Sequence, residues 1–475
     1  MVVQPADVFL SPTLTPDAAA AYLSSMGFRD SAAADQRLQD MAAELVVRET
    51  LGGMADRLFA SLCKAADPDR ALHGLARYID VCVSKTSFLR ELSGDAPALD
   101  LLTQIFGGSP FLTDVLVRNP EYFHWLSPQI ARAAPTFATR ERYINALLET
   151  FVGAVPSLNA LRRLKRRELL GIAAREMLGR DSVATSMRQL SDLADMLIQR
   201  AFSLVCQSAC LAADCMEVPG AIAVIATGKL GGRELDYLSG IDLQYVYAAD
   251  DPADAKADDL FQDIARQLTS VLVDDATESE LYRVDVPTCP RGAATRLAFS
   301  FAEWEAGITK RGMSDRFALI KTRQIAGDPG LGDRFAALAE PFVYGEPLER
   351  EAADEMFRVS RAAEPLKTLE LFTQILQLTH GADHPEMRCQ NTSDALAALS
   401  VGGFLTREAY GALTAAFVFL RTVAHRLQLV QASDGAPDER EQDCCARQLG
   451  FRGAAALHRE IEAHRDRVQA FCSAW

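Results

Sequence analysis

Two apolar stretches separated by a glycine-rich turn stand out in the hydrophobic pattern near the middle of the chain. Residues 221–226 form an unbroken apolar run, which has the length of a buried strand. Residues 241–247 alternate instead, so side chains two positions apart share a face. One face carries Ile241, Leu243, Tyr245 and Tyr247, and the other carries Asp242, Gln244 and Val246. The pattern predicts a buried strand, a turn and a half-buried strand.

The turn between these two strands contains Gly228, Gly231 and Gly232. A residue without a Cβ lets the backbone turn sharply and approach a ligand closely. Consecutive amides in such a loop form a concavity that suits a phosphate anion. Most loops of this kind are only turns, so the glycines alone leave both interpretations open.

Helical periodicity dominates the rest of the chain. Residues 1–155 read as helical, with a break at Phe106–Phe111, where glycines and a proline interrupt the pattern. A well-formed apolar stripe over 413–427 predicts a bundle helix. Residues 281–286 alternate again and predict a further strand, on which Asp285 shares the polar face. The chain therefore combines many helices with a few strands.

Composition narrows the class of partner and compartment. The chain has 475 residues and a net charge of −15, which makes it a poor binder of nucleic acid. We find no apolar run that is long enough to span a bilayer. The N-terminus, MVVQPADVFLSPTLTPD, lacks the basic start and apolar stretch of a signal peptide. We expect a cytoplasmic protein with neither a nucleic acid nor a membrane as its partner.

Two other clusters carry a chemical and a bland interpretation each. Cys206 and Cys210 lie four apart on a helical stretch, but buried reduced thiols are favoured because a zinc site needs more ligands. The basic run at 162–167 would be a phosphate-binding face or, in the bland interpretation that charge patterning favours, either a solvated helix surface or charges paired within an acidic protein.

The glycine-rich turn, taken together with its flanking strands, carries a more specific signal. Residues 228–235 read GKLGGREL, and Ser239, Ile241, Asp242 and Leu243 follow. This stretch resembles the signature of the glutamine synthetase adenylyltransferase family, bacterial enzymes with a DNA polymerase β-like nucleotidyltransferase domain. Matching segments also occur at Phe317–Asp328, at Asn391–Thr392 and at Phe419–Gln428, so the resemblance covers almost the whole chain. Full-length enzymes of the family usually have two such repeats, and we find one here.

The departures from the family pattern fall on polar site positions. Gly240 stands where the family has the first aspartate of an Asp-x-Asp pair, whose two carboxylates share a strand face and can share Mg²⁺ ions. Pro287 and Cys289 replace two family arginines, although Pro290 and Gly292 match the end of that segment. Thr368 stands where the family has another aspartate. Glu234 and Asp236 are close to Gly240 in sequence, but the sequence does not show that they reach its place.

The resemblance implies an α+β fold, mostly helical, in which a polymerase β-like domain with a small mixed sheet is flanked by helical regions. The expected organisation is an N-terminal helical region at 1–155, a nucleotidyltransferase-like domain at 156–335 and a C-terminal helical bundle at 336–475.

Two functions remain open. As an enzyme, the chain would transfer AMP from Mg²⁺- or Mn²⁺-bound ATP to a tyrosine of glutamine synthetase, or remove it by phosphorolysis, with a PII-type protein as regulator. As a binding protein, it would keep the fold and a docking surface without catalysis, which the lost site positions favour. By resemblance, the catalytic and metal residues would be Asp242 and Asp285. The nucleotide would contact Gly228, Lys229, Gly231, Gly232, Arg233, Lys321 and Arg323.

Overall fold

The computed structural model describes residues 3–151, 153–274, 280–285, 296–360, 364–431 and 435–474. Spatial contacts divide the chain into two compact units. The first unit comprises residues 1–134, 170–181 and 423–460, and the second comprises 135–169, 182–422 and 461–475. These units are defined in space, and the three sequence regions expected above stay a prediction.

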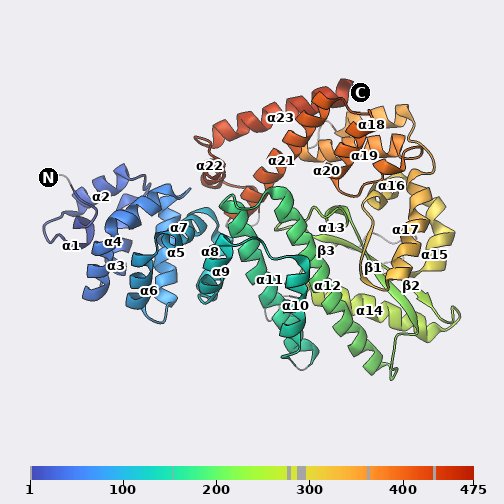
Figure 1. Ribbon diagram of the computed structural model, residues 1–475, viewed down its shortest axis with the longest axis horizontal. Helices are drawn as coiled ribbons and strands as arrows, with labels where there is room; N and C mark the ends of the chain where they lie inside the picture. The colour runs from blue at the N-terminus through green and yellow to red at the C-terminus, as the bar shows by residue number, and fades with distance from the viewer. Residues whose placement is uncertain are drawn as a thin grey trace. The chain divides into compact units, whose positions relative to one another are not determined.

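Twelve helices precede the sheet in the described chain (Figure 1). They are α1 (Asp7–Leu10), α2 (Pro16–Ser25), α3 (Ser31–Met41), α4 (Leu45–Lys64), α5 (Pro68–Val81), α6 (Lys85–Gly94), α7 (Ala96–Gly108), α8 (Pro110–Arg118), α9 (Tyr122–Ala131), α10 (Phe137–Leu148), α11 (Ala154–Met177) and α12 (Val183–Ala212). The predicted helical character of the first 155 residues is confirmed.

The first unit is stabilised by aromatic packing and by side-chain caps. Tyr78, Phe106 and Phe123 are buried together, with Tyr78 at the centre of ring contacts to the other two. The break predicted at 106–111 is confirmed, because Ser109 accepts a hydrogen bond from the Leu112 amide and caps α8.

The sheet lies in the second unit, and helices alternate with its strands along the chain. The elements are β1 (Gly220–Thr227), α13 (Gly228–Gly231), β2 (Ile241–Ala249), α14 (Ala255–Val273), β3 (Val284–Asp285), β4 (Ala298–Ser300), α15 (Phe301–Gly307), α16 (Met313–Ile320) and β5 (Arg323–Gly327). The sheet is mixed, as the resemblance implied. The strand order is β3-β2-β1-β5, with β4 also paired to β2. The pairs β1–β2 and β1–β5 are antiparallel, whereas β2–β3 and β2–β4 are parallel.

Both faces of the sheet are covered by helices, which explains why β1 is apolar throughout. On one face, Tyr245 of β2 shares a hydrogen bond of 2.8 Å with Thr269 of α14. On the other, Val246 packs in a core cluster with Phe335 of the helix that follows β5. Val246 was predicted on the polar face of a half-buried strand and is instead fully buried, because this helix covers that face.

The chain after β5 is helical again. The helices are α17 (Pro329–Tyr344), α18 (Arg350–Ser360), α19 (Pro365–His380), α20 (Thr392–Val401), α21 (Arg407–Val430), α22 (Glu439–Gln448) and α23 (Ala454–Ala474). The apolar stripe predicted on α21 is confirmed, since Leu413 and Phe417 are buried in the core cluster.

By length and composition alone, α21 is the one helix in the described chain that could cross a bilayer, with a mean hydropathy of 1.2 in its 18-residue window. From the sequence we expected no apolar run that is long enough to span a bilayer. A buried core helix passes the same test, and 56% of the window is buried.

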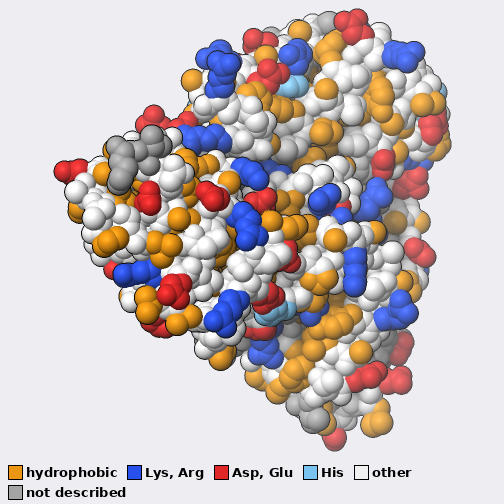
Figure 2. Space-filling model, turned by 60° about the vertical axis from the view of Figure 1, so that its left-hand side comes forward, with side chains coloured by type: hydrophobic (Ala, Val, Ile, Leu, Met, Phe, Trp, Pro, Cys, Tyr) orange, Lys and Arg blue, Asp and Glu red, His pale blue; other side chains and the backbone are white. Residues whose placement is uncertain are grey.

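On the face drawn in Figure 2, acidic and basic side chains are interspersed rather than gathered into one basic field.

Candidate functional site

The two aspartates predicted as metal ligands lie side by side at one edge of the sheet. Strand β2 runs parallel to β3, and Asp242 is the register partner of Asp285. The Ile241 amide donates a hydrogen bond of 2.8 Å to the carbonyl of Arg283, which fixes this pairing. Neighbouring strands are about 4.8 Å apart, so both carboxylates can reach one small ion or one substrate atom. The structure therefore brings together residues that lie 43 positions apart in sequence.

The charge of this pair is visible in the pKa of Asp242. Burial raises the pKa of the Asp242 carboxyl above its ordinary value, and the negative charge of Asp285 raises it further. The Lys229 ammonium acts in the opposite direction. Two carboxylates held together in this way favour a cation or a proton between them.

Gly228 opens the space in which the Asp242 carboxylate lies. Its φ is +59°, a left-handed conformation that glycine adopts readily. A Cβ at this position would lie 2.3 Å from Oδ2 of Asp242, so any larger residue would displace the carboxylate. Gly228 thus belongs to the site predicted from sequence, although its contact is with a catalytic candidate rather than with a phosphate.

Lys229 lies at the edge of the same site and is held by two neighbours. Its Nζ donates to Oδ2 of Asp236 at 2.7 Å and lies 2.8 Å from the Ser239 hydroxyl. Asp236 is almost fully buried, whereas the Lys229 side chain is 42% exposed. The ammonium is therefore fixed in position and still open to an anionic ligand.

Gly240 lies directly beside this carboxylate pair. A Cβ on Gly240 would be 2.8 Å from Oδ2 of Asp285, so the position where the resembled family has its first aspartate faces the site. Neither acidic neighbour replaces it, because the carboxylates of Glu234 and Asp236 are bonded to Lys321 and Lys229 respectively. Among the residues that the structure describes, no group of three or more His, Cys, Asp or Glu side chains could hold a metal ion. Two carboxylates suit a single Mg²⁺ that is also bound by substrate phosphates.

The other two glycines of the loop face the protein interior. A Cβ on Gly231 would lie 1.7 Å from the carbonyl oxygen of Lys321. A Cβ on Gly232 would lie 3.0 Å from the carbonyl oxygen of Gln390. Gly231 and Gly232, predicted to contact the nucleotide, are therefore small because other backbone segments pack against them.

The other three predicted nucleotide-binding cations, like Lys229, are engaged in ion pairs within the second unit. Lys321 is buried, and its Nζ bonds Glu234 at 2.6 Å. Arg323 makes a bidentate pair with Asp195, at 2.6 and 2.9 Å. Arg233 pairs with Asp192 at 2.5 Å. The sequence prediction that Lys321 and Arg323 would flank one site assumed an extended segment, whereas Lys321 lies at the end of α16 and Arg323 begins β5.

Two models of known protein families match parts of this chain. The model of the glutamate-ammonia ligase adenylyltransferase family matches residues 99–338, about half of the chain. The chain belongs to this family. A second model, of the PII-uridylyltransferase, matches residues 366–475.

Three relatives of the adenylyltransferase family are each named as a bifunctional glutamine synthetase adenylyltransferase/adenylyl-removing enzyme. The protein of Streptomyces coelicolor is 30% identical over 464 residues, covering 90% of this chain and 44% of the relative. The protein of Streptomyces avermitilis is 30% identical, covering 92% and 45%. That of Rhodopseudomonas palustris is 28% identical, covering 85% and 44%. The chain spans about half the length of these relatives.

Other family positions lie elsewhere in the structure or outside its described part. Pro287, Cys289, Pro290 and Gly292 fall outside the described residues. The basic run at 162–167 is charge-paired where it is buried, since Arg162 is 3% exposed and bonds Asp274 at 3.0 Å. Charge pairing, one form of the favoured interpretation, agrees with this arrangement, whereas a solvated helix surface does not, because no residue of this run is exposed.

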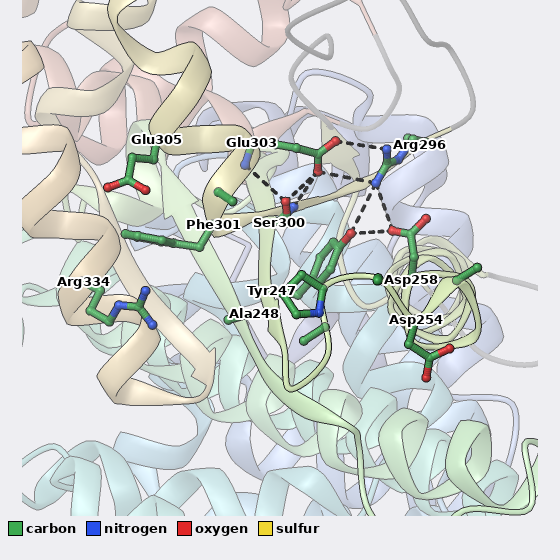
Figure 3. Close-up of a pocket in the computed structure, with 15 residues that line it drawn as sticks. Tyr247, Ala248, Asp254, Asp258, Arg296, Ser300, Phe301, Glu303, Glu305 and Arg334 are labelled. Atoms are coloured by element: carbon green, nitrogen blue, oxygen red, sulfur yellow. Dashed lines mark hydrogen bonds and ion pairs between the residues drawn. The ribbon is translucent and has the colours of Figure 1, made fainter.

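A second concavity, of about 480 Å³, lies at the opposite end of β2 (Figure 3). From Asp242 to Tyr247, which lines it, the strand rises about 16 Å. Arg296 sits there between Asp258, at 2.9 Å, and Glu303, at 3.1 Å. Figure 3 shows these three charged groups converging above Tyr247. The pocket was not predicted, because its lining comes from five separate elements, β2, α14, β4, α15 and α17, without a shared sequence motif.

Proposed function

We propose that this chain acts on the adenylyl–tyrosine linkage of glutamine synthetase at the Asp242–Asp285 site. In transfer, the tyrosine oxygen attacks the α-phosphorus of ATP and pyrophosphate leaves. In removal, inorganic phosphate attacks the phosphorus of the tyrosine-linked AMP, which releases ADP and restores the hydroxyl group. The observation that carries the proposal is the pairing of Asp242 with Asp285 beside Gly228 and Lys229.

Asp242 and Asp285 would hold one Mg²⁺ or Mn²⁺, and the ion would neutralise phosphate charge when bound. The residues of the chain then have distinct roles. Gly228 leaves room for the Asp242 carboxylate, and Lys229 contributes a fixed positive charge beside the transferred phosphate. Catalysis would come mostly from positioning and charge stabilisation. The contacts of Gly231, Gly232, Lys321 and Arg323 support a role in shaping the loop rather than in binding the nucleotide. Arg233 pairs with Asp192 but is 43% exposed, so like Lys229 it stays open to an anionic ligand.

A second candidate function is a non-catalytic binding protein that keeps the family fold. Gly240 supports it, because the site has two carboxylates where the family pattern has three. Such a protein would bind glutamine synthetase or a regulator without transferring AMP. The match of residues 366–475 to the PII-uridylyltransferase supports a PII-type regulator as a further partner.

We propose the cytoplasm as the compartment, because ATP and glutamine synthetase are there. A fluorescent fusion protein found outside the cytoplasm would contradict this proposal.

The deciding experiment measures AMP transfer from labelled ATP to purified glutamine synthetase, and phosphate-dependent release of AMP, with Mg²⁺ or Mn²⁺. It compares the unmodified chain with Gly240→Asp, Asp242→Asn and, as a matched control at the second pocket, Asp258→Asn. Activity that is lost in Asp242→Asn and kept in Asp258→Asn supports catalysis at the carboxylate pair. Activity only in Gly240→Asp assigns the silence to one missing carboxylate. No activity in any folded variant favours the binding function.

A further inference from the structure

A cluster of buried charges surrounds Glu234, which lies two residues after the glycine loop (residues 228–232). The Glu234 carboxylate is fully buried. It accepts a hydrogen bond of 2.6 Å from the Lys321 ammonium and another from the Thr392 amide, and Arg421 lies 3.5 Å away. Arg421 also bonds Glu370, so two anions and two cations balance. Burial alone would raise the pKa of Glu234, but Lys321 and Arg421 outweigh it and lower that pKa.

The members of this cluster come from the two segments matched by different family models. Glu234, just after the glycine loop, and Lys321, at the end of α16, belong to the span 99–338. Glu370, Thr392 and Arg421 belong to the span 366–475, on α19, α20 and α21. All of these residues lie in the second unit. The buried charges are therefore the chemical link between the glycine loop and the helices that follow the sheet.

The same region holds the glycine loop by its backbone. The Glu234 amide donates to the carbonyl of Lys229 at 2.8 Å, and the Gly232 amide donates to that of Gly228 at 3.0 Å. The Asn391 side chain donates to the carbonyl of Gly232 at 3.0 Å. A displacement of Glu234 would thus be transmitted to Lys229 and Gly228, the two loop residues that adjoin Asp242.

We propose that Glu234 is a positioning residue, which fixes the glycine loop against Asp242 by tying it to α19, α20 and α21. This role deepens the proposed function and rests on it where catalysis is concerned, but the loop contact itself can be tested without activity. The hydrogen-bond and ion-pair partners of the Glu234 side chain are Lys321, Thr392 and Arg421 and include neither Asp242 nor Asp285, so Glu234 would act through the loop.

Hydrogen exchange of the full chain separates positioning from general stability. Glu234→Gln keeps the side-chain shape but leaves Lys321 as an unpaired buried cation. Glu234→Gln with Lys321→Met removes both charges and keeps aliphatic packing on Gly232, since Cδ of Lys321 lies 3.0 Å from an ideal Cβ there. Glu168→Gln is the matched control, because Glu168 is also buried and pairs with Arg140 at 3.1 Å elsewhere in the unit.

We expect amides 228–236 to exchange about tenfold faster in Glu234→Gln, beyond any change in global stability measured by urea unfolding. The double variant is expected to recover global stability while the loop amides stay fast. The control is expected to leave them within about twofold of the unmodified chain. If Glu234→Gln does not fold, Glu370→Gln gives a milder test. Glu370 is the other partner of Arg421, and its side chain is 22% exposed.

Two results would overturn the proposal. In the first, the exchange rate of the loop amides returns to that of the unmodified chain when the double variant recovers its global stability. In the second, that rate is unchanged in a folded Glu234 or Glu370 variant. Failure of the proposed function is seen separately. If the unmodified chain transfers no AMP but the loop responds as expected, the positioning role stands and only its catalytic consequence is lost.

Discussion

Gly231→Ala distinguishes a glycine needed for ligand access from one needed for packing. The methyl group would lie 1.7 Å from the carbonyl oxygen of Lys321, half of the 3.4 Å at which ordinary contact begins, and 2.9 Å from that of Ala226. Both oxygens belong to the backbone, so no side-chain rotation relieves the overlap. The φ of Gly231 is not in the left-handed region, so the expected cost is steric alone. Overpacking that moves backbone costs about 3 kcal/mol.

Thermal unfolding measures this cost. With an unfolding entropy of about 2.1 cal/mol/K per residue, the second unit shifts by a little under 2 °C per kcal/mol, so we expect the Tm of Gly231→Ala to fall by about 5 °C. The control is Gly411→Ala, an exposed position inside α21 where a Cβ meets no atom within 4 Å. It should stabilise the protein by about 0.5–1 kcal/mol through helix propensity. A Gly231→Ala protein that melts with the unmodified chain, yet binds ATP less tightly, would refute the packing explanation and restore the phosphate cradle.

The remaining predictions concern charge. Gly240→Asp should lower the Tm without metal, because it adds a carboxylate beside Asp285, and Mn²⁺ should raise its Tm more than that of the unmodified chain; equal shifts would argue against a shared site. Asp242→Asn should stabilise the metal-free protein at pH 7, because a raised pKa in the fold means that stability falls as the pH rises through it; urea unfolding should show the gain shrinking as the pH falls toward 3.8. Asp67→Asn should do the reverse in the first unit, where Arg440 and Arg70 hold the pKa of Asp67 below its ordinary value despite burial. Its cost at pH 7 should vanish as the pH falls below 3.8, and a constant cost would exclude the ion pair as its cause.

The sequence predicted the framework because its signals are local. Three features illustrate this: the break between helices at Ser109, the alternation of β2 and the apolar stripe of α21. Each depends only on residues of one short segment of the chain. The prediction that Val246 lies on the polar face of a half-buried strand was wrong because burial of that face is not a local property. Which face of a strand is covered depends on α17, which begins more than 80 residues later.

Site residues divided along the same line. The pairing of Asp242 with Asp285 was expected from the family resemblance, and the structure places them together. The partners of Lys321 and Arg323 could not be predicted, because Glu234 and Asp195 lie 87 and 128 residues away in sequence. A buried cation and a phosphate-binding cation look alike in a sequence, since both are lysine or arginine in a polar motif. Only the position of the opposing carboxylate decides between them.

The glycine loop also shows why a well-kept motif is weak support for catalysis. Glu234 and Lys321 cannot be lost singly without leaving a buried charge unpaired, which typically costs about 3–5 kcal/mol. Stability therefore favours their retention whether or not the chain transfers AMP. Asp242 is different, because its burial, and after it the negative charge of Asp285, raises the pKa of Asp242 and so opposes folding at neutral pH. A pair that costs stability without a cation is better explained by ligand binding than by packing, so these two carboxylates, rather than the longer glycine motif, carry the argument for an enzyme.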